Sequence, residues 1–371
     1  MNPKQNIQSI QALRGLAAIL VVLFHYSITL ELNPSNPIAI FLSHGWSGVD
    51  LFFIISGFIA AYTVSIQDKG VKSSLEYLAK RAARIIPLYY LVTLTNMGHS
   101  TESYLETVKS MLFIPLGGTG PDSLGPLYGG ARIGQGWTLN YEMYFYFVVA
   151  ISMAFGKAKW FFTSGFMILT VLLPVAIFGL PESYGFSGFR FDNQYISLMT
   201  NPIIFEFIMG ILVYFIFKKM NSHASAIWYL FIAISIVAFA YNLYSPIFYI
   251  SRITAWALTA SFLMISLLKL EAMGKLQFNN FILKIGNISF SIYLLHEGVQ
   301  GILLKLMKKI SGNADIFSNF SMRFVLFSLS LVLTYYVSLL SYKYIERSLS
   351  NKFRDVLLRK IRFSNLEKKP V

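Results

Sequence analysis

The stretch Gln11-Ala-Leu-Arg-Gly-Leu-Ala-Ala-Ile-Leu-Val-Val-Leu-Phe-His-Tyr26 decides the fold class. It has the composition of a membrane helix, yet it carries Arg14 and His25, its only side chains that charge near neutral pH. Eleven positions at ~100° each come to about three full turns, so both side chains lie on nearly one helix face, roughly 16 Å apart along the axis. If Arg14 lies at the cytoplasmic edge, His25 lies near mid-depth, where a polar group is costly and indicates function. The structural alternative is a buried histidine that only hydrogen-bonds a neighbouring helix.

The composition of the whole chain agrees with a membrane protein. Of its 371 residues, 55% are hydrophobic and only 13% are charged, which excludes a soluble globular domain and a disordered chain. The apolar stretches run to about twenty residues without alternation, so they indicate helices and not a β-barrel. The chain has no cysteine, which excludes disulfides, thiolate metal ligands and a cysteine nucleophile.

The distribution of charge sets the expected topology. The net charge of +14 could suggest nucleic acid, but the basic residues fall mainly in short loops between apolar runs and in the C-terminal tail. This positive-inside pattern favours an all-α bundle of about ten spans with both termini in the cytoplasm. The expected membrane domain is 1–345, followed by a short basic tail, 346–371, lying as a helix on the inner leaflet. The ten expected spans are 10–30, 47–66, 85–98, 137–155, 160–180, 198–217, 226–244, 247–268, 286–305 and 320–344.

Three regions outside the long apolar runs carry further expectations. The third span, 85–98, is short for crossing the hydrocarbon core, so it is either extended by snorkelling arginines or re-entrant. The segment 99–136 is rich in Gly and Pro and is expected to be an external loop with turns. A second external loop, 181–197, offers polar groups for a substrate, although solvation alone explains them equally well.

Several ionisable residues lie within or at the edges of the apolar runs, and each needs a partner there. Asp50 either orients an imidazole or binds substrate hydroxyls, or it only suits the helix dipole. Glu142 lies about one and a half turns inside the fourth span and is expected to form an acid/base pair with His25. A packing hydrogen bond is the alternative for Glu142, while His296 is expected to be structural or substrate-orienting. The full set beyond Arg14 and His25 is Asp50, Glu142, Glu206, Arg252, His296, Glu297 and Glu346.

Arg81 and Arg84, three residues apart, share a helix face where the chain enters the third span. Two guanidinium groups on one face can bind phosphates bidentately, as a cytosolic phosphorylated donor would need. Taken alone, charge that only sets topology explains them as well.

Together these pieces resemble the acyltransferase-3 family of bacterial integral-membrane acyltransferases, which transfer acetyl or other acyl groups onto sugars of surface polysaccharides. The resemblance spans nearly the whole chain, and it rests on the order and spacing of five pieces. These are Arg14 with His25, Gly48–Phe58, Arg81-x-x-Arg84-Ile-x-Pro-x-Tyr89, Trp137-Thr-Leu-Asn-Tyr-Glu142, and Ser291-Ile-Tyr-Leu-Leu-His296.

The resemblance implies that His25 is catalytic, that Glu142 is an essential group of the site, and that Arg14, Arg81 and Arg84 serve an acyl-CoA donor such as acetyl-CoA. Asp50, Trp137, Asn140 and His296 are expected to contact or orient the substrate, and no metal is expected. Threonine at 138, where serine is commoner, is a small departure without evident consequence.

The expected function is therefore an acyl-CoA-dependent O-acyltransferase in the bacterial inner membrane that acts on a cell-surface glycan or its lipid-linked precursor. A transporter or flippase would also place charges at mid-depth, but no Gly/Pro-broken helices pair up in two matching halves of the chain. A non-enzymatic scaffold for polysaccharide assembly leaves the register of Arg14 and His25 unexplained. The expected partners are the donor, the acceptor, the lipid bilayer and, as an open alternative, further copies of the chain, with no nucleic acid.

Overall fold

A computed structural model describes residues 7–64, 68–117, 130–180, 188–219, 224–244, 253–311 and 319–363. Within these ranges the chain is all-helical, and its only β-type pairing is an isolated bridge between Leu116 and Gly130. The prediction of an all-α fold is confirmed. The α-helices are α1 (Gln8–Ser27), α2 (Pro37–Ser43), α3 (Gly48–Thr63), α4 (Gly70–Thr95), α5 (Thr101–Met111), α6 (Gly136–Ser152), α7 (Lys159–Phe178), α9 (Gln194–Thr200), α10 (Phe205–Lys219), α11 (Ser225–Tyr244), α12 (Leu258–Ala272), α13 (Asn280–Asn287), α14 (Ser289–Ser311), α15 (Phe320–Ser341) and α16 (Ser350–Phe363).

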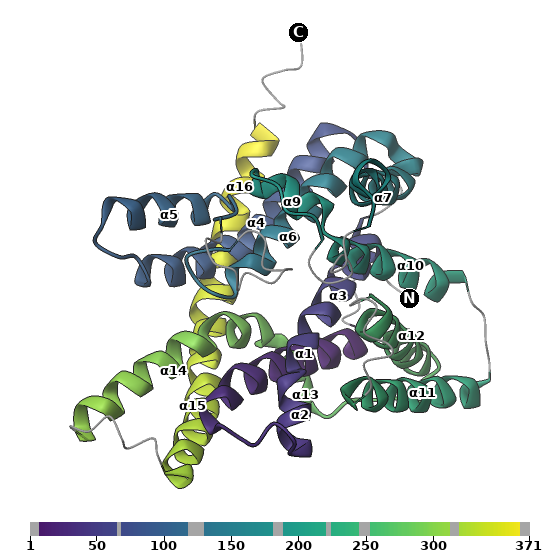
Figure 1. Cartoon of the computed structure of the whole chain (residues 1–371). Coiled ribbons are helices and arrows are strands. Elements are labelled where there is room, and N and C mark those ends of the chain that lie inside the picture. Colours follow the sequence, from purple (N-terminus) through teal and green to yellow (C-terminus); the bar gives the residue numbers. More distant parts are fainter. Residues whose placement is uncertain are drawn as a thin grey trace.

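Helix α1 lies at the centre of the bundle, where it packs against α3, α12, α13 and α14 (Figure 1). Its buried residues include Leu13, Ala17 and Val21, which recur every four positions along one face. The helix is unbroken from Gln8 to Ser27, so the one-face register expected for Arg14 and His25 is maintained.

The backbones of helices α3 and α10 approach each other so closely at Gly57 and Gly210 that no side chain would fit there. A Cβ added at Gly57 would lie 2.0 Å from the carbonyl oxygen of Phe207, and one added at Gly210 would lie 2.0 Å from that of Ile54. Small residues at a helix interface let the two backbones touch, which is how membrane helices gain packing contacts. This close pair fixes α3 in place, and α3 forms a wall of the site described below.

Six helical stretches of the described chain are long and apolar enough to cross a membrane, or seven if the pair Gln194–Thr200 and Pro202–Lys219, bent by 50°, forms one span. One of the six, Gly136–Phe178, contains both α6 and α7, which are separated by a kink at Gly156. The chain is thus a multi-pass membrane protein. The count of ten spans and the cytoplasmic placement of both termini stay predictions.

The structure changes two sequence expectations. Residues 85–95 of the short third span belong to the longer α4, which begins at Gly70, contains Pro87 and ends at Thr95. The segment 99–136 contains helix α5 as well as turns, and the Ser100 hydroxyl caps that helix by accepting a hydrogen bond from the Ser103 N–H. The turns expected within 118–129, the part of the second loop at 181–187, and Arg252 lie outside the described residues.

Within the expected tail, 346–371, the described part contains helix α16, and its position on the inner leaflet stays a prediction. Helix α16 follows α15 through a π-helical segment, Tyr342–Leu349, and packs along α4 (Figure 1).

Candidate active site

His25 lies beside a carboxylate and a second imidazole that both come from α14. Its Nε2 is 3.2 Å from Glu297 Oε1, and its Nδ1 is 3.2 Å from His296 Nε2. The Nδ1 of His25 is also 2.9 Å from the backbone carbonyl of Val21, one turn back on α1. This centre therefore joins groups 271 and 272 residues apart in the sequence, His25 with His296 and with Glu297.

The carbonyl partners fix where the protons lie on both rings. A carbonyl oxygen only accepts, so His25 Nδ1 carries the hydrogen that it donates to Val21, and His296 Nδ1 donates to the carbonyl of Tyr293 at 2.8 Å. The Nε2 of His296 then presents a lone pair to His25 Nδ1–H. The only proton-accepting atom of His25 is consequently Nε2, which faces Glu297.

One proton decides whether His25 Nε2 and Glu297 attract each other. With neutral imidazole and ionised carboxylate, two lone pairs face each other across 3.2 Å. Uptake of a single proton converts this contact into a charge-assisted hydrogen bond between imidazolium and carboxylate. The arrangement can therefore take a proton from a hydroxyl and hold it.

The Glu297 carboxylate is supported from behind by a loop residue, Gly134. A Cβ added at Gly134 would lie 2.8 Å from Glu297 Oε2, so only glycine leaves room for the carboxylate in its present place. The side chains of His25 and Glu297 are 29% and 36% exposed, so a substrate can reach the pair.

His296 is the most enclosed member of the centre. It is fully buried, and its backbone carbonyl accepts a hydrogen bond from the Tyr26 hydroxyl, which also contacts Thr334 of α15 at 2.6 Å. These bonds fix α14 against α1 and α15. His296 contacts His25 directly, and its expected structural or substrate-orienting role stays a prediction.

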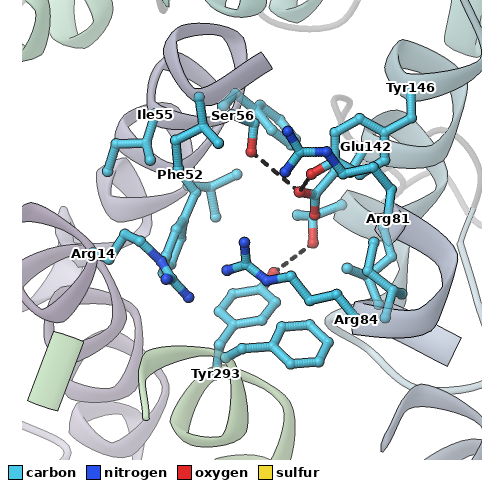
Figure 2. A pocket seen from close by; sticks show the side chains of 16 residues that line it. Arg14, Phe52, Ile55, Ser56, Arg81, Arg84, Glu142, Tyr146 and Tyr293 are labelled. Carbon is cyan, nitrogen blue, oxygen red and sulfur yellow. Dashed lines mark hydrogen bonds between the residues drawn. The ribbon is translucent and has the colours of Figure 1, made fainter. Parts of the chain in front are cut away.

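A small cavity beneath this centre collects three arginines, and we call it the arginine cavity. It has a volume of about 60 Å³ and lies between α1, α3, α4, α6 and α14. Figure 2 shows Arg14, Arg81 and Arg84 extending toward it, with Glu142 beside them. Three cations with one carboxylate on a shared wall make it a candidate site for an anion.

Glu142 has partners other than the one expected. It accepts hydrogen bonds from Ser56 Oγ at 3.1 Å and from the Tyr146 hydroxyl (Figure 2). The acid/base pair expected between His25 and Glu142 does not form, because Glu297 occupies the position beside the imidazole. A role for Glu142 in turnover stays a prediction, now as a member of the arginine cavity.

Arg81 is held by aromatic rings on two sides. Its guanidinium carbon lies 5.2 Å from the ring centre of Tyr77 and 5.1 Å from that of Tyr146, and it donates a hydrogen bond to Thr63 Oγ1 at 2.9 Å. Contacts of this kind fix the plane of the guanidinium, and a charge that only sets topology does not need them.

The arginine cavity reaches the histidine centre through Tyr293. This tyrosine lines the cavity, its hydroxyl is 2.8 Å from Thr138 Oγ1, and its ring centre is 6.2 Å from that of His296. Tyr293 also stacks edge-on against Phe52 at 5.5 Å. Tyr293 thus lies between the arginine cavity and the His296 ring.

Of the other expected site residues, Asp50 and Asn140 are buried and Trp137 is half-buried. Asp50 is fully buried in the first turn of α3, and Asn140 is 2% exposed on α6. Trp137 packs edge-on against Phe53 and Tyr141. Their expected contacts with substrate stay predictions.

The histidine centre is also the group of described residues able to hold a metal ion, since ligand atoms of His25, His296 and Glu297 all lie within 4.8 Å of one another. Hydrogen bonds to backbone carbonyls orient the two imidazoles, and the Glu297 carboxylate faces His25 Nε2. Metal-free chemistry stays an expectation.

Sequence reasoning named Glu297 as an intramembrane ionisable group but gave it no role. Its signal is its position next to His296 in an otherwise apolar run, yet only the packing of α1 against α14 shows that it faces His25.

Comparison with known proteins identifies the family of the chain. The family model described as "Acyltransferase domain" matches residues 7–343. The chain is 32% identical over 273 residues to the exopolysaccharide production protein ExoZ of Rhizobium meliloti, covering 70% of this chain and 78% of that protein. It is 24% identical over 370 residues to the putative membrane-bound transacylase BcsY of Komagataeibacter xylinus, covering 93% and 83%.

A further relative is the putative acetyltransferase ORF330 of Acidianus two-tailed virus, 26% identical over 315 residues, with 80% of this chain and 86% of that protein covered. No solved structure matches the chain significantly. The family match, which extends over nearly the whole membrane bundle and both halves of the histidine centre, shows that the chain belongs to the acyltransferase-3 family of membrane acyltransferases.

Proposed function

We propose that the protein moves an acyl group, in the simplest case acetyl, from acyl-CoA to a hydroxyl of a cell-surface polysaccharide or of its lipid-linked sugar precursor. The observation that carries this proposal is the pair formed by His25 and Glu297 next to a cavity with three arginines. One part suits proton transfer from a hydroxyl, and the other suits a phosphorylated donor. The relative ExoZ is named an exopolysaccharide production protein, which supports a glycan acceptor.

The donor binds from the cytoplasm in this proposal. Arg81 and Arg84 on α4 hold its diphosphate, Arg14 on α1 adds a third positive charge, and the thin pantetheine arm extends along α1 toward His25. Arg14 and His25 are about 16 Å apart along α1, so an extended arm is needed between them. Glu142 spaces the guanidinium groups within the cavity and takes part in turnover through them.

At the histidine centre, the acceptor oxygen attacks the thioester carbonyl carbon while His25 Nε2 takes its proton. The Glu297 carboxylate then stabilises the imidazolium that forms. As the carbon–sulfur bond breaks, the leaving thiolate receives this proton, and CoA leaves as a free thiol. An alternative order, in which His25 first accepts the acyl group and then passes it to the hydroxyl, uses the same nitrogen.

The acceptor lies on the exposed side of His25 and Glu297. Asp50, Trp137, Asn140 and His296 orient it or shape its site, and no metal takes part. The bacterial inner membrane is the proposed location, since a cytosolic donor and a surface glycan meet there.

The test is transfer of radiolabelled acetyl from acetyl-CoA to glycan by purified protein in lipid vesicles. Label is expected in the glycan with the wild-type protein and not with His25→Ala. Movement of unmodified glycan across the vesicle membrane without label transfer would instead identify a transporter. Label that stays on denatured wild-type protein when glycan is omitted would select the two-step order.

A further inference from the structure

A second cavity lies at the far end of the arginine cavity from His25, and we call it the outer cavity. It has a volume of about 260 Å³, and its wall includes Thr63 of α3 together with Ser73, Tyr77, Lys80 and Arg81 of α4. Arg81 belongs to the walls of both cavities. Of the two rings that hold Arg81, Tyr77 lines the outer cavity and Tyr146 lines the arginine cavity, so the held guanidinium forms the partition between them.

Helix α3 connects the two cavities along one face. Its lining residues are spaced three or four positions apart or adjacent to one another, which keeps them on one side of a helix. In order they are Val49, Phe52, Phe53, Ile55, Ser56 and Ile59 in the arginine cavity, then Thr63 in the outer cavity. From Val49 to Thr63 this face is roughly 21 Å long. A long ligand following α3 would therefore extend from the outer cavity, past Arg81, toward the histidine centre.

The sizes of the two cavities assign different parts of such a ligand to each. At about 60 Å³ the arginine cavity has room for a few water molecules or a narrow chain, and it is too small for a nucleoside. The outer cavity, at about 260 Å³, is more than four times larger and approaches the size of ordinary small-molecule sites.

The charges of the outer cavity favour an anion. Two acids lie on its wall, Asp68 and Glu76, and each has a cation next to it. Glu76 pairs with Arg362 of α16 at 4.0 Å, and the Lys159 ammonium donates a hydrogen bond to the backbone carbonyl of Asp68 at 2.7 Å. With Arg362 and Lys159 counted beside Lys80 and Arg81, four cations surround the two acids, so the net charge around the outer cavity is positive.

We propose that the outer cavity binds the phosphorylated adenosine of the donor, with Lys80 beside its ribose phosphate, while the diphosphate lies at Arg81 and Arg84. This inference rests on the proposed use of acyl-CoA. It adds a nucleotide site, with Ser73 and Lys80, that lies outside the cavity expected from the arginines alone.

The experiment fills the outer cavity and leaves the arginines in place. In Ser73→Trp, an indole occupies the wall of the cavity, whereas Leu75→Trp places the same ring on the exposed side of α4 as the matched control. Binding of adenosine 3′,5′-bisphosphate to purified protein in detergent is measured by calorimetry. Wild type and Leu75→Trp are expected to bind it, Ser73→Trp is expected to lose at least ten-fold in affinity, and Lys80→Gln is expected to lose several-fold.

Transfer assays give the second measurement. The KM for acetyl-CoA should rise at least ten-fold in Ser73→Trp, while the KM for acetyl-pantetheine, which lacks the nucleotide, should stay unchanged. Equal bisphosphate binding by Ser73→Trp and wild type would overturn the nucleotide site. Bisphosphate binding without any acetyl transfer by the wild type would overturn the proposed function and leave the nucleotide site standing.

Discussion

His25 is held by one edge and reacts at the other. Its Nδ1 is engaged by Val21 and His296, so Nε2 beside Glu297 is the atom that can accept a proton or an acyl group. Because Nδ1 holds the ring and Nε2 reacts, the imidazole does not have to move between the steps of the reaction. The two histidines differ in this respect, because both ring nitrogens of His296 have partners. Its Nδ1–H donates to a carbonyl, and its Nε2 faces Nδ1 of His25.

His25→Ala is expected to lower the transfer rate by about 10²- to 10⁴-fold, the usual contribution of a positioned acid/base group. Membrane insertion should be unchanged, because one imidazole contributes little to the hydropathy of α1. Transfer of labelled acetyl is measured together with the amount of protein in the membrane fraction. Normal turnover by a well-inserted variant would contradict the mechanism.

Gly134→Ala tests whether the position of the Glu297 carboxylate matters. The new methyl group would lie 2.8 Å from Oε2 and displace it from His25, so we expect kcat to fall about 10- to 100-fold with little change in KM for the donor. Shortening the side chain in Gly134→Ala/Glu297→Asp removes the clash and should recover part of the rate. The kcat of the double variant is compared with that of Glu297→Asp alone. If Gly134→Ala lowers kcat by the same factor in the Glu297→Asp background as in the wild type, Gly134 does not act through Glu297.

These residues show what sequence alone could predict. The register of Arg14 and His25 follows from helical periodicity within one element, and α1 confirms it. The partner of His25 depends on which helix packs against α1, and the sequence alone does not choose among the five carboxylates in the apolar runs, Asp50, Glu142, Glu206, Glu297 and Glu346. The prediction chose Glu142, whereas packing of α14 brings Glu297.

At the scale of elements, α4 joins the two parts of the donor site. Its first turns reach the outer cavity and its middle lines the arginine cavity, with Arg81 in both. Pairing of α16 with α4 holds the outer end through Arg362 and Glu76. The two-sided aromatic contact of Arg81 explains why a planar guanidinium is present there.

Replacing Arg81 and Arg84 together by lysine keeps the charge and so should keep the topology. The planar fork and the ring contacts of Arg81 are lost, and donor binding should weaken by ~1.5–3 kcal/mol, roughly ten- to a hundred-fold. Acetyl-CoA affinity is measured on purified protein in detergent at two salt concentrations. Since the outer cavity is open to solvent, higher salt should reproduce part of the loss in the wild type. If the variant and the wild type bind acetyl-CoA equally well, both arginines only set the membrane topology.

At the scale of the molecule, hydropathy does not identify two of the five helices that build the site. Helices α4 and α14 are long enough to span a membrane, yet they are not among the six apolar stretches of the described chain. Each carries several charged residues, including Arg81 and Arg84 on α4 and Glu297 on α14. The charged residues proposed for the chemistry lower the mean hydropathy of these two helices. A search for apolar segments therefore misses them.

The topology can be tested with single cysteines, because the chain has none of its own. Helix α16 packs along α4, so the regions of Lys72 and Lys352 should face the same side of the membrane. The ion pair between Glu31 and Arg323 joins the end of α1 to the start of α15 at what we expect to be the opposite side. All three test positions, Ser35, Lys72 and Lys352, are exposed.

In intact cells, a membrane-impermeant maleimide should label Ser35→Cys and leave Lys72→Cys and Lys352→Cys unlabelled until the membrane is opened. The expected order follows from the excess of Lys and Arg around 69–84 and in the tail, which retains these segments in the cytoplasm. Labelling of Lys72→Cys from outside would place the outer cavity on the external face. A cytosolic nucleotide donor could not then reach Lys80, even if His25 remained essential.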